Sequence, residues 1–375
     1  MSGSLPSVGI FGAGAIGAFV GALLSSAGAP VVLVGRGRLL EEHAAGRVVA
    51  IGAGAREARL AADAIVTDDP AALADVDVCL VSVKSGATAE AARTLRSTLR
   101  RGDTRVISVQ NGLRNRAILA DALGQPVSAG VVGFNVAPDG AGRFPQTVAG
   151  ALWLEAGDPR VAAIAAALRR SGQRVRERAE IDAVIRGKLL VNAINGVGGA
   201  TGMATRSLLA DVDARRCYAR SIREGLAAFA AGDEAVARVG GLGPRGLAWL
   251  LGLPDWIFRP LLARSSADPE AVTSTVQDLR RRRPTEIDAL NGEIVALGEA
   301  RGVATPMNRA IVAAVRAHEA AARAGADPEF LTPAALLGRG LDPSTSSTST
   351  STTSTSTAAR SPATSPAAHR SPPWR

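Results

Sequence analysis

Apolar and polar positions follow two different patterns along the chain, one before and one after about residue 180. In the first part, short runs of β-branched and aliphatic residues alternate with alanine- and leucine-rich stretches. Continuous apolar runs are typical of buried strands, and their alternation with helical segments predicts a parallel sheet covered on both faces. The expected strands are Ser7–Phe11, Val31–Val34, Val78–Val83, Arg105–Val109, Val127–Phe134, Ala149–Glu155 and Arg174–Arg176.

In the second part, strand-like runs stop and apolar residues recur at the spacing of one helix face. This periodicity predicts an all-helical domain over residues 180–332, after an α/β domain over residues 1–179. Residues 344–357 are all Ser or Thr and offer nothing to a core, so we expect residues 333–375 to be a disordered tail. The expected helices are Ile181–Ala193, Asp211–Ala231, Val272–Arg283, Pro284–Arg301 and Asn308–Ala324.

Composition removes several classes of function. The formal net charge is +9, yet aromatic residues make up only 3% of the chain, so no nucleic-acid binding is expected and anionic small molecules are the expected partners. Three histidines and two cysteines predict neither a metal site nor a disulfide framework. The apolar runs are broken by glycines and charges, and no signal peptide precedes them. We therefore expect a cytoplasmic protein with no membrane span.

A glycine motif follows the first expected strand and opens a helix. In such a motif the first glycine permits a tight turn, the second lets a pyrophosphate approach the backbone, and the third lets helix and strand pack closely. The helix N-terminus adds N–H groups and a positive dipole end for phosphates. A glycine-rich turn without a ligand is the alternative. We expect a dinucleotide to be bound by Gly12, Ala13, Gly14, Ala15, Ile16 and Gly17.

The second expected strand runs into Gly35 and Arg36. A site that prefers NAD places an acidic residue here for the ribose hydroxyls, whereas a guanidinium suits the 2′-phosphate of NADP. Arg36 therefore predicts NADP(H), with Arg38 as a second candidate contact. The alternative is that Arg36 is a solvated loop residue.

Two further strands end in polar residues at the same edge, where ligands collect outside the carboxyl ends of a parallel sheet. Lys84 follows Val78–Val83 and could meet a cofactor phosphate or a substrate carboxylate. Asn111 follows Arg105–Val109, and its amide could hydrogen-bond a substrate carbonyl or carboxylate. An ordinary surface lysine and a plain Asn-Gly turn are the alternatives.

Lysine is rare in this chain, since Lys84 and Lys188 are the only two among 43 basic residues. Arginine supplies charge but does not readily release a proton, so a retained lysine is a candidate proton donor. Lys188 and Asn192 are four residues apart, on one face of the otherwise apolar helix Ile181–Ala193. Burial would lower the pKa of Lys188 toward neutral pH, which suits a general acid. The alternative is a snorkelling lysine at the domain junction.

Polar residues also begin the later helices. Pro284 is typical of a first helical turn, so Glu286 and Asp288 are expected near the positive end of Pro284–Arg301. Ser274 similarly lies at the start of Val272–Arg283. Taken locally, these residues need no role beyond starting a helix.

Together the motifs resemble the ketopantoate reductase family over roughly residues 6–325. In that family NADPH reduces the 2-oxo group of 2-dehydropantoate to pantoate, a step toward coenzyme A. The resemblance implies a Rossmann domain, a helical domain that binds substrate, and a cleft between them; a homodimer is left open. It rests on the glycine motif, Arg36, Val83-Lys84, Gln110-Asn111-Gly112, Lys188 to Asn192, Ser274 with Gln277-Asp278, and Thr285 to Asp288 with Asn291-Gly292.

Site roles follow from the same resemblance. It implies that Lys188 protonates the carbonyl oxygen, and that Glu286 holds the lysine and contacts a substrate hydroxyl. Substrate contacts are implied for Asn111, Asn192, Asn195 and Ser274, and cofactor contacts for Arg36, Lys84 and Asn111.

Some positions depart from the family pattern. The stretch after Asn192 is glycine-rich and about one residue short, so Asn195 is out of register with the family's second asparagine. Trp249 and Trp256 are bulky for a cap over so small a substrate. Two alternatives therefore stay open: a reductase of the same fold for a bulkier 2-oxo acid, and a non-catalytic NADP-binding sensor.

Overall fold

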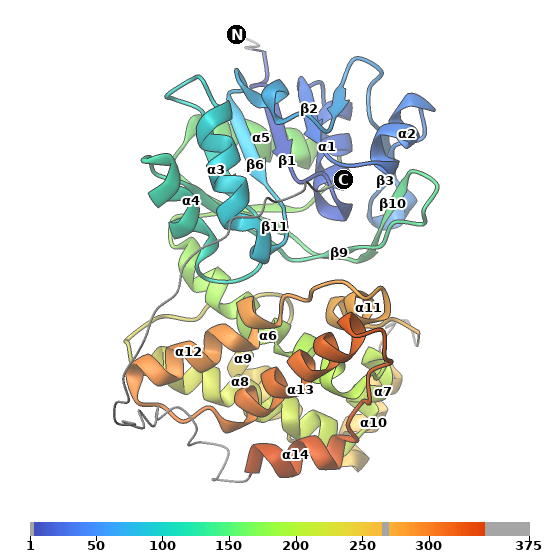
Figure 1. Ribbon diagram of the computed structural model, residues 1–375, viewed down its shortest axis with the longest axis vertical. Helices are drawn as coiled ribbons and strands as arrows, with labels where there is room; N and C mark the ends of the chain where they lie inside the picture. Colours follow the sequence, from blue (N-terminus) through green and yellow to red (C-terminus); the bar gives the residue numbers. More distant parts are fainter. Residues whose placement is uncertain (1–3, 265–269, 342–375) are drawn as a thin grey trace, which may run out of the picture.

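The computed structural model describes residues 4–264 and 270–341. Two domains are stacked along the long axis, with the sheet domain formed by the first half of the chain and the helical domain by the second (Figure 1). The Ser/Thr tract that we expect to be disordered lies outside the described residues. None of the described helices is long and apolar enough to cross a membrane.

An eight-stranded sheet forms the centre of the first domain. In spatial order its strands are β12 (Val175–Arg178), β11 (Leu152–Glu155), β8 (Ser128–Val132), β7 (Arg105–Ser108), β6 (Val78–Val81), β1 (Val8–Phe11), β2 (Val31–Val34) and β5 (Ile65–Thr67). The strands from β8 to β5 run parallel, as the alternation predicts. β11 pairs antiparallel with β8, so the sheet is mixed at this end.

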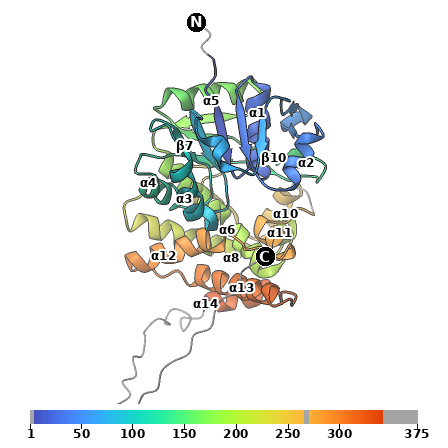
Figure 2. The ribbon, with the colours of Figure 1, turned by 45° about the horizontal axis from the view of Figure 1, so that its top comes forward.

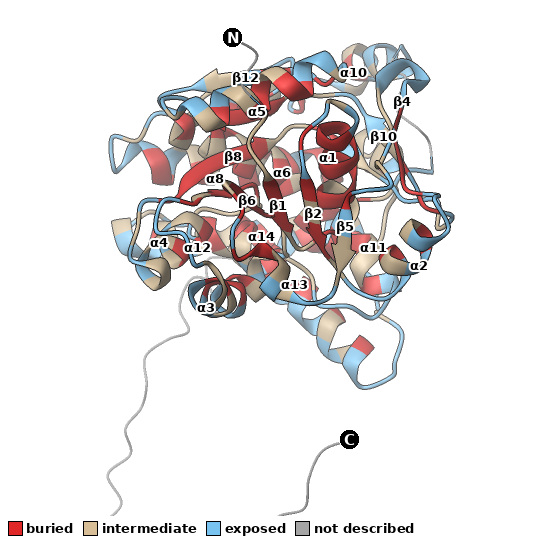
Figure 3. Cartoon of the chain, turned by 90° about the horizontal axis from the view of Figure 1, so that it is seen from above, coloured by how far each residue is buried: buried red, intermediate tan, exposed pale blue. Residues whose placement is uncertain are grey.

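Helices cover both faces of this sheet. One face packs against α1 (Ala15–Ser26) and α5 (Pro159–Arg170). The other packs against α3 (Thr88–Thr98) and α4 (Asn115–Leu123). The central strands are therefore buried on both sides, which accounts for their continuous apolar runs (Figure 3).

Sequence patterning missed a second sheet, which has four strands. In spatial order they are β4 (Glu57–Arg59), β3 (Val49–Ile51), β10 (Arg143–Val148) and β9 (Asn135–Val136). These strands are short, and β3 pairs with a strand that follows it by some 90 residues, so no local pattern reveals the pairing. The helix α2 (Arg38–Ala44) lies on the same side of the domain (Figure 1).

The second domain is helical throughout its described part. Its helices are α6 (Ile181–Thr201), α7 (Thr205–Ala210), α8 (Val212–Ala230), α9 (Pro244–Leu250), α10 (Asp255–Ala263), α11 (Ser274–Arg280), α12 (Asn291–Arg301), α13 (Pro306–Arg323) and α14 (Pro333–Leu341). α6 starts against the sheet domain, where Ile181 packs with Trp153, and continues into the helical core through Leu190 and Val197. It therefore connects the two domains (Figure 2).

The predicted boundary at residue 333, between the helical domain and the tail, is wrong. Residues 333–341 form α14, because Leu336 is fully buried in the helical core and Gly340 packs against Met307. A helix that short shows little periodicity in the sequence, so only its packing reveals it.

The expected helix Pro284–Arg301 is also corrected. A 3₁₀ turn at Ile287–Ala289 comes first, and α12 begins only at Asn291. Glu286 therefore lies ahead of a short turn, at the junction with the sheet domain, and not inside the first turn of a long helix.

Candidate active site

The glycine turn between β1 and α1 has the geometry that its sequence predicts. Gly12 has a φ of +96°, a backbone angle that residues with a side chain rarely adopt. A Cβ there would lie 2.5 Å from Val83 Cγ1. A Cβ on Gly17 would lie 2.8 Å from Ser82 Oγ. Only glycines let α1 and the end of β6 approach this closely.

The same turn leaves room for a dinucleotide on its open side. A Cβ on Gly14 would meet no heavy atom closer than 4.0 Å, so the backbone there is accessible. The first intrahelical hydrogen bond of α1 runs from Ala18 N to Gly14 O at 2.8 Å, which leaves the N–H groups of Ala15, Ile16 and Gly17 outside the helical ladder. These groups fit a pyrophosphate.

Arg36 lies just beyond the carboxyl end of β2, and its side chain is exposed. The guanidinium of Arg36 has no ion pair or hydrogen bond to another described residue. Arg38 is different, because its guanidinium pairs with Glu42 at 3.3 Å. Of the two arginines, Arg36 is the one whose guanidinium is available to a ligand.

Lys84 reaches into the helical domain. Its ammonium lies 2.6 Å from Asp278 Oδ1 and donates to Pro284 O at 3.2 Å. Burial raises the pKa of Asp278, against the opposing effect of the Lys84 ammonium. A compact ammonium with three donors can serve both a carboxylate and a carbonyl, which gives a physical reason for lysine at this position. Its expected contact with the cofactor stays a prediction.

The carboxylate of Glu286 crosses from the helical domain to the sheet domain. It accepts hydrogen bonds from Ser85 N at 3.1 Å and Asn111 Nδ2 at 3.0 Å, and Ser85 Oγ lies 3.0 Å away. Asn192 extends this network, because its Nδ2 donates to Asn111 Oδ1 at 3.2 Å. No ion pair joins Glu286 to Lys188 among the described residues, and the implied role of holding the lysine stays a prediction.

Lys188 lies one helical turn before Asn192 on the same face of α6. No carboxylate in residues 4–264 or 270–341 pairs with its ammonium. Burial lowers the pKa of Lys188 from 10.5 to about 8. The group is therefore charged at neutral pH yet able to release its proton close to it, which is what a general acid requires.

Asn195 shares this face of α6. The helix was expected to end at Ala193, but it continues to Thr201. Lys188, Asn192 and Asn195 therefore fall at positions i, i+4 and i+7 of one continuous helix, in a single polar stripe. The shortened, glycine-rich stretch does not displace Asn195 from that stripe.

Ser274 opens α11 and is exposed, and its side chain makes no hydrogen bond to another described residue. The residue before it, Thr273, caps α11 and donates through Oγ1 to Asn195 O at 3.5 Å. A Cβ on Gly198 would lie 2.8 Å from the same Oγ1. The glycines of α6 therefore let α11 pack closely and bring Ser274 next to the stripe.

Sequence reasoning gave no role to Ser85 or Asp278. Ser85 follows Lys84 at the end of β6, so its place at the carboxyl edge could have been inferred. Asp278 lies one turn after Ser274 on α11. Their partners belong to the other domain, however, and no local pattern identifies them.

The two tryptophans noted in the sequence and the neighbouring Phe258 differ in burial. Phe258 is buried, with the guanidinium carbon of Arg215 4.4 Å from its ring centre. Trp249 and Trp256 are 66% and 77% exposed.

Comparison with known proteins gives a consistent answer. A family model described as ketopantoate reductase PanE/ApbA matches residues 8–159, and the model for the C-terminal part of that family matches residues 180–319. A 2-dehydropantoate 2-reductase of Archaeoglobus fulgidus is 29% identical over 316 residues, 83% of this chain and 97% of that protein. One from Halobacterium salinarum is 29% identical over 323 residues, 81% of this chain and 96% of that protein.

Solved structures share the fold. A ketopantoate reductase of Ralstonia eutropha JMP134 superposes with a TM-score of 0.72 at 27% identity, covering 84% of this chain and 99% of that one. A D-mandelate dehydrogenase in complex with NADH and anilino(oxo)acetate reaches 0.70 at 23% identity, with coverages of 84% and 99%. The second likeness shows the fold alone.

Proposed function

Because the chain belongs to the ketopantoate reductase family, we propose that it reduces the 2-oxo group of 2-dehydropantoate to pantoate with NADPH. The curated relatives are oxidoreductases named for this reaction. The observation that carries the proposal is the position of Lys188, a half-buried lysine with a pKa of about 8 on the polar stripe of α6.

The proton is proposed to come from Lys188 Nζ. NADPH, when bound at the glycine turn, supplies the hydride. Negative charge that develops on the carbonyl oxygen is stabilised by the Lys188 ammonium, which then donates its proton to that oxygen. Because no described carboxylate neutralises this ammonium, its charge is available to the substrate.

Asn111, Asn192 and Glu286 are proposed to position the substrate. The amide of Asn111 donates to Glu286 and accepts from Asn192, which fixes the orientation of both amides. Asn192 Oδ1 and the remaining lone pairs of Glu286 can then accept hydrogen bonds from substrate hydroxyls. Groups held in this way need little reorganisation when substrate binds.

The substrate assignment is tested by initial rates of NADPH oxidation against 2-dehydropantoate, 2-oxoisovalerate and phenylglyoxylate. We expect the highest kcat/KM with 2-dehydropantoate. Faster turnover of phenylglyoxylate would contradict this assignment and indicate a bulkier 2-oxo acid. Tight NADPH binding without turnover of any oxo acid would indicate a sensor.

Preference for NADPH is proposed to depend on Arg36. Arg36→Glu should lower kcat/KM for NADPH by roughly 10- to 100-fold, because a charge-assisted bond to the 2′-phosphate becomes a repulsion, and should change that for NADH only a few-fold. Arg93→Glu, at an exposed position of α3, makes the same charge change elsewhere and should alter neither. An equal loss with both cofactors would contradict the role of Arg36.

We also propose that the helical domain provides the interface of a homodimer. Its exposed Trp249 and Trp256 offer apolar surface that a second copy could bury. Sedimentation velocity tests the assembly: twice the chain mass of 38.2 kDa is expected, and a species of 38.2 kDa at micromolar concentration would contradict it.

A further inference from the structure

A cavity of about 510 Å³ lies near the first turns of α6, where the sheet domain meets the loop between α8 and α9. Arg176 and Arg178 reach it from the edge strand β12, and Trp153 from the adjacent β11. Arg238 comes from the loop, which is held to α6 by a hydrogen bond from Ala237 N to Ala183 O at 2.8 Å. Both domains therefore line this cavity.

The cavity has an aromatic floor that orders two of its arginines. Trp153 is only 5% exposed and packs with Val184 and Val239. The guanidinium carbons of Arg176 and Arg178 lie 4.9 and 5.5 Å from the centre of its ring. Stacking on an indole restrains a guanidinium, while its N–H groups stay available at the edges. These two groups are thus in place before any ligand arrives.

The positive charge of the cavity is not balanced by its own residues. Among the described residues, no acid pairs with Arg176, Arg178 or Arg238. The nearby Arg186, by contrast, pairs with Glu234 at 3.6 Å. Glu180 supplies the one carboxylate of the lining, against three guanidiniums. An anion placed between them would relieve their mutual repulsion.

We propose that this cavity binds a small organic phosphate. Planar guanidinium forks match phosphate oxygens, so Arg176, Arg178 and Arg238 would hold the anionic group. The apolar surface of Ala183 and Val184 would meet the organic part, and the volume is in the range of small-molecule sites. The inference does not depend on the proposed reaction, because none of these residues belongs to the polar stripe of α6.

Calorimetric titration of the full chain with phenyl phosphate tests the proposal. NADP⁺ is kept at one equivalent per chain, which blocks the cofactor site without an excess of a second organic phosphate that could compete for the cavity. We expect saturable binding to the wild type, and binding at least about tenfold weaker to Arg176→Ala/Arg178→Ala. The control Arg93→Ala/Arg100→Ala removes the same charge from α3 and its end, and should bind as the wild type does.

Three outcomes would overturn the proposal: no binding to the wild type at millimolar probe, equal affinity for wild type and double variant, or equal affinity for phenyl phosphate and inorganic phosphate. Arg176→Lys/Arg178→Lys provides a second test, because it keeps the charge and removes the planar fork. It should bind several-fold more weakly than the wild type, and unchanged affinity would contradict the role of the guanidiniums.

Discussion

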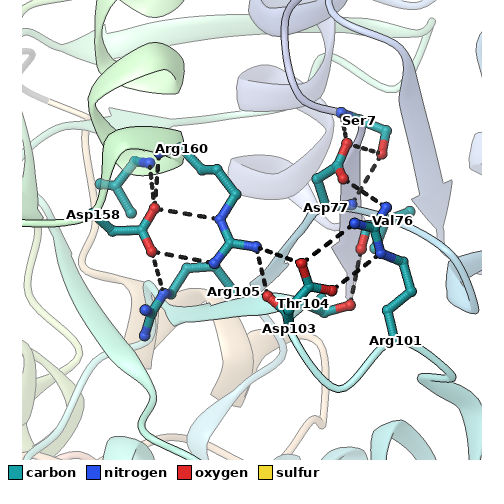
Figure 4. A network of polar contacts seen from close by, with 10 residues as sticks. Ser7, Val76, Asp77, Arg101, Asp103, Thr104, Arg105, Asp158 and Arg160 are labelled. Carbon is teal, nitrogen blue, oxygen red and sulfur yellow. Dashed lines mark hydrogen bonds and ion pairs between the residues drawn. The ribbon is translucent and has the colours of Figure 1, made fainter.

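The eight-stranded sheet differs between the end where its parallel strands begin and the end where they finish, in whether charged side chains are paired. At the edge where the parallel strands begin, acids and arginines neutralise one another (Figure 4). Asp77 accepts hydrogen bonds from Ser7 N and Oγ at 2.9 and 2.8 Å and pairs with Arg101 at 2.8 Å. Asp158 caps α5 and pairs with Arg105 at 2.7 Å.

Where the strands end, two basic residues lack such partners. Lys188 has no carboxylate beside it in the described part of the chain, and Arg36 has no partner there either. The groups that are paired, such as Glu286 with Ser85 and Lys84 with Asp278, join the sheet domain to the helical domain.

The pKa values at the two edges teach the same lesson. Burial raises the pKa of Asp158, but hydrogen bonds from Arg160 and Arg105 outweigh it and lower the value to about 2. At the other edge, burial alone lowers the pKa of Lys188. A paired acid stabilises the fold, whereas an unpaired, half-buried lysine costs stability and gains a usable proton.

The largest effect is expected from Lys188→Met. The turnover rate should fall by about 10²- to 10⁴-fold, because the proton donor is lost. The free energy of unfolding at pH 7 should rise by about 1 to 3 kcal/mol, since a pKa of about 8 in the folded state, against 10.5 in the unfolded chain, means that the charge on this group opposes folding.

Steady-state kinetics measure the turnover rate of Lys188→Met, and urea unfolding at two pH values measures its free energy of unfolding. The gain in stability should be present below pH 8 and should shrink as the pH rises toward 10.5, where the lysine is neutral in both states. A variant that is less stable at pH 7, or that turns over at the wild-type rate, would contradict the account of Lys188.

Asp158→Ala should do the reverse, lowering the free energy of unfolding at pH 7 by about 2 kcal/mol and leaving turnover unchanged. The depressed pKa stabilises the wild type above pH 3.8, and this contribution is lost as the pH falls toward 2. Asp75→Ala is the matched control at the same edge, because its pair with Arg100 is long, at 3.8 Å, and exposed. Urea unfolding measures both variants. Equal losses in the free energy of unfolding would contradict the stabilising role of the partly buried Asp158 pair.

Glu286→Gln should lower kcat/KM by about tenfold, because an amide cannot accept all the hydrogen bonds that Ser85 and Asn111 donate. Glu293→Gln is the control, since Glu293 also joins the domains, through Arg114 at 2.6 Å. If Glu286 only holds the domains together, steady-state kinetics of the two variants will show the same loss.

The features that could be predicted from the sequence are those that short segments determine. β2 begins and ends at the expected residues, because Val31–Val34 is an unbroken β-branched and aliphatic run. The glycine turn was also predictable, since the required backbone angles and close approaches belong to Gly12, Gly14 and Gly17 themselves.

Contacts between distant segments were out of reach. Ser85 and Glu286 are 201 positions apart, and Lys84 meets Asp278 across the same junction. The helix predicted to start at Pro284 failed for a related reason. The backbone there follows contacts with the other domain and forms a 3₁₀ turn, which helix propensity alone does not anticipate.

The central claim, that Lys188 is the proton donor, is tested most directly by the pH dependence of kcat/KM for 2-dehydropantoate at saturating NADPH. We expect a plateau at neutral pH and a fall approaching tenfold per pH unit above about 8, as Lys188 loses its proton. A value that stays constant up to pH 10 would contradict the assignment.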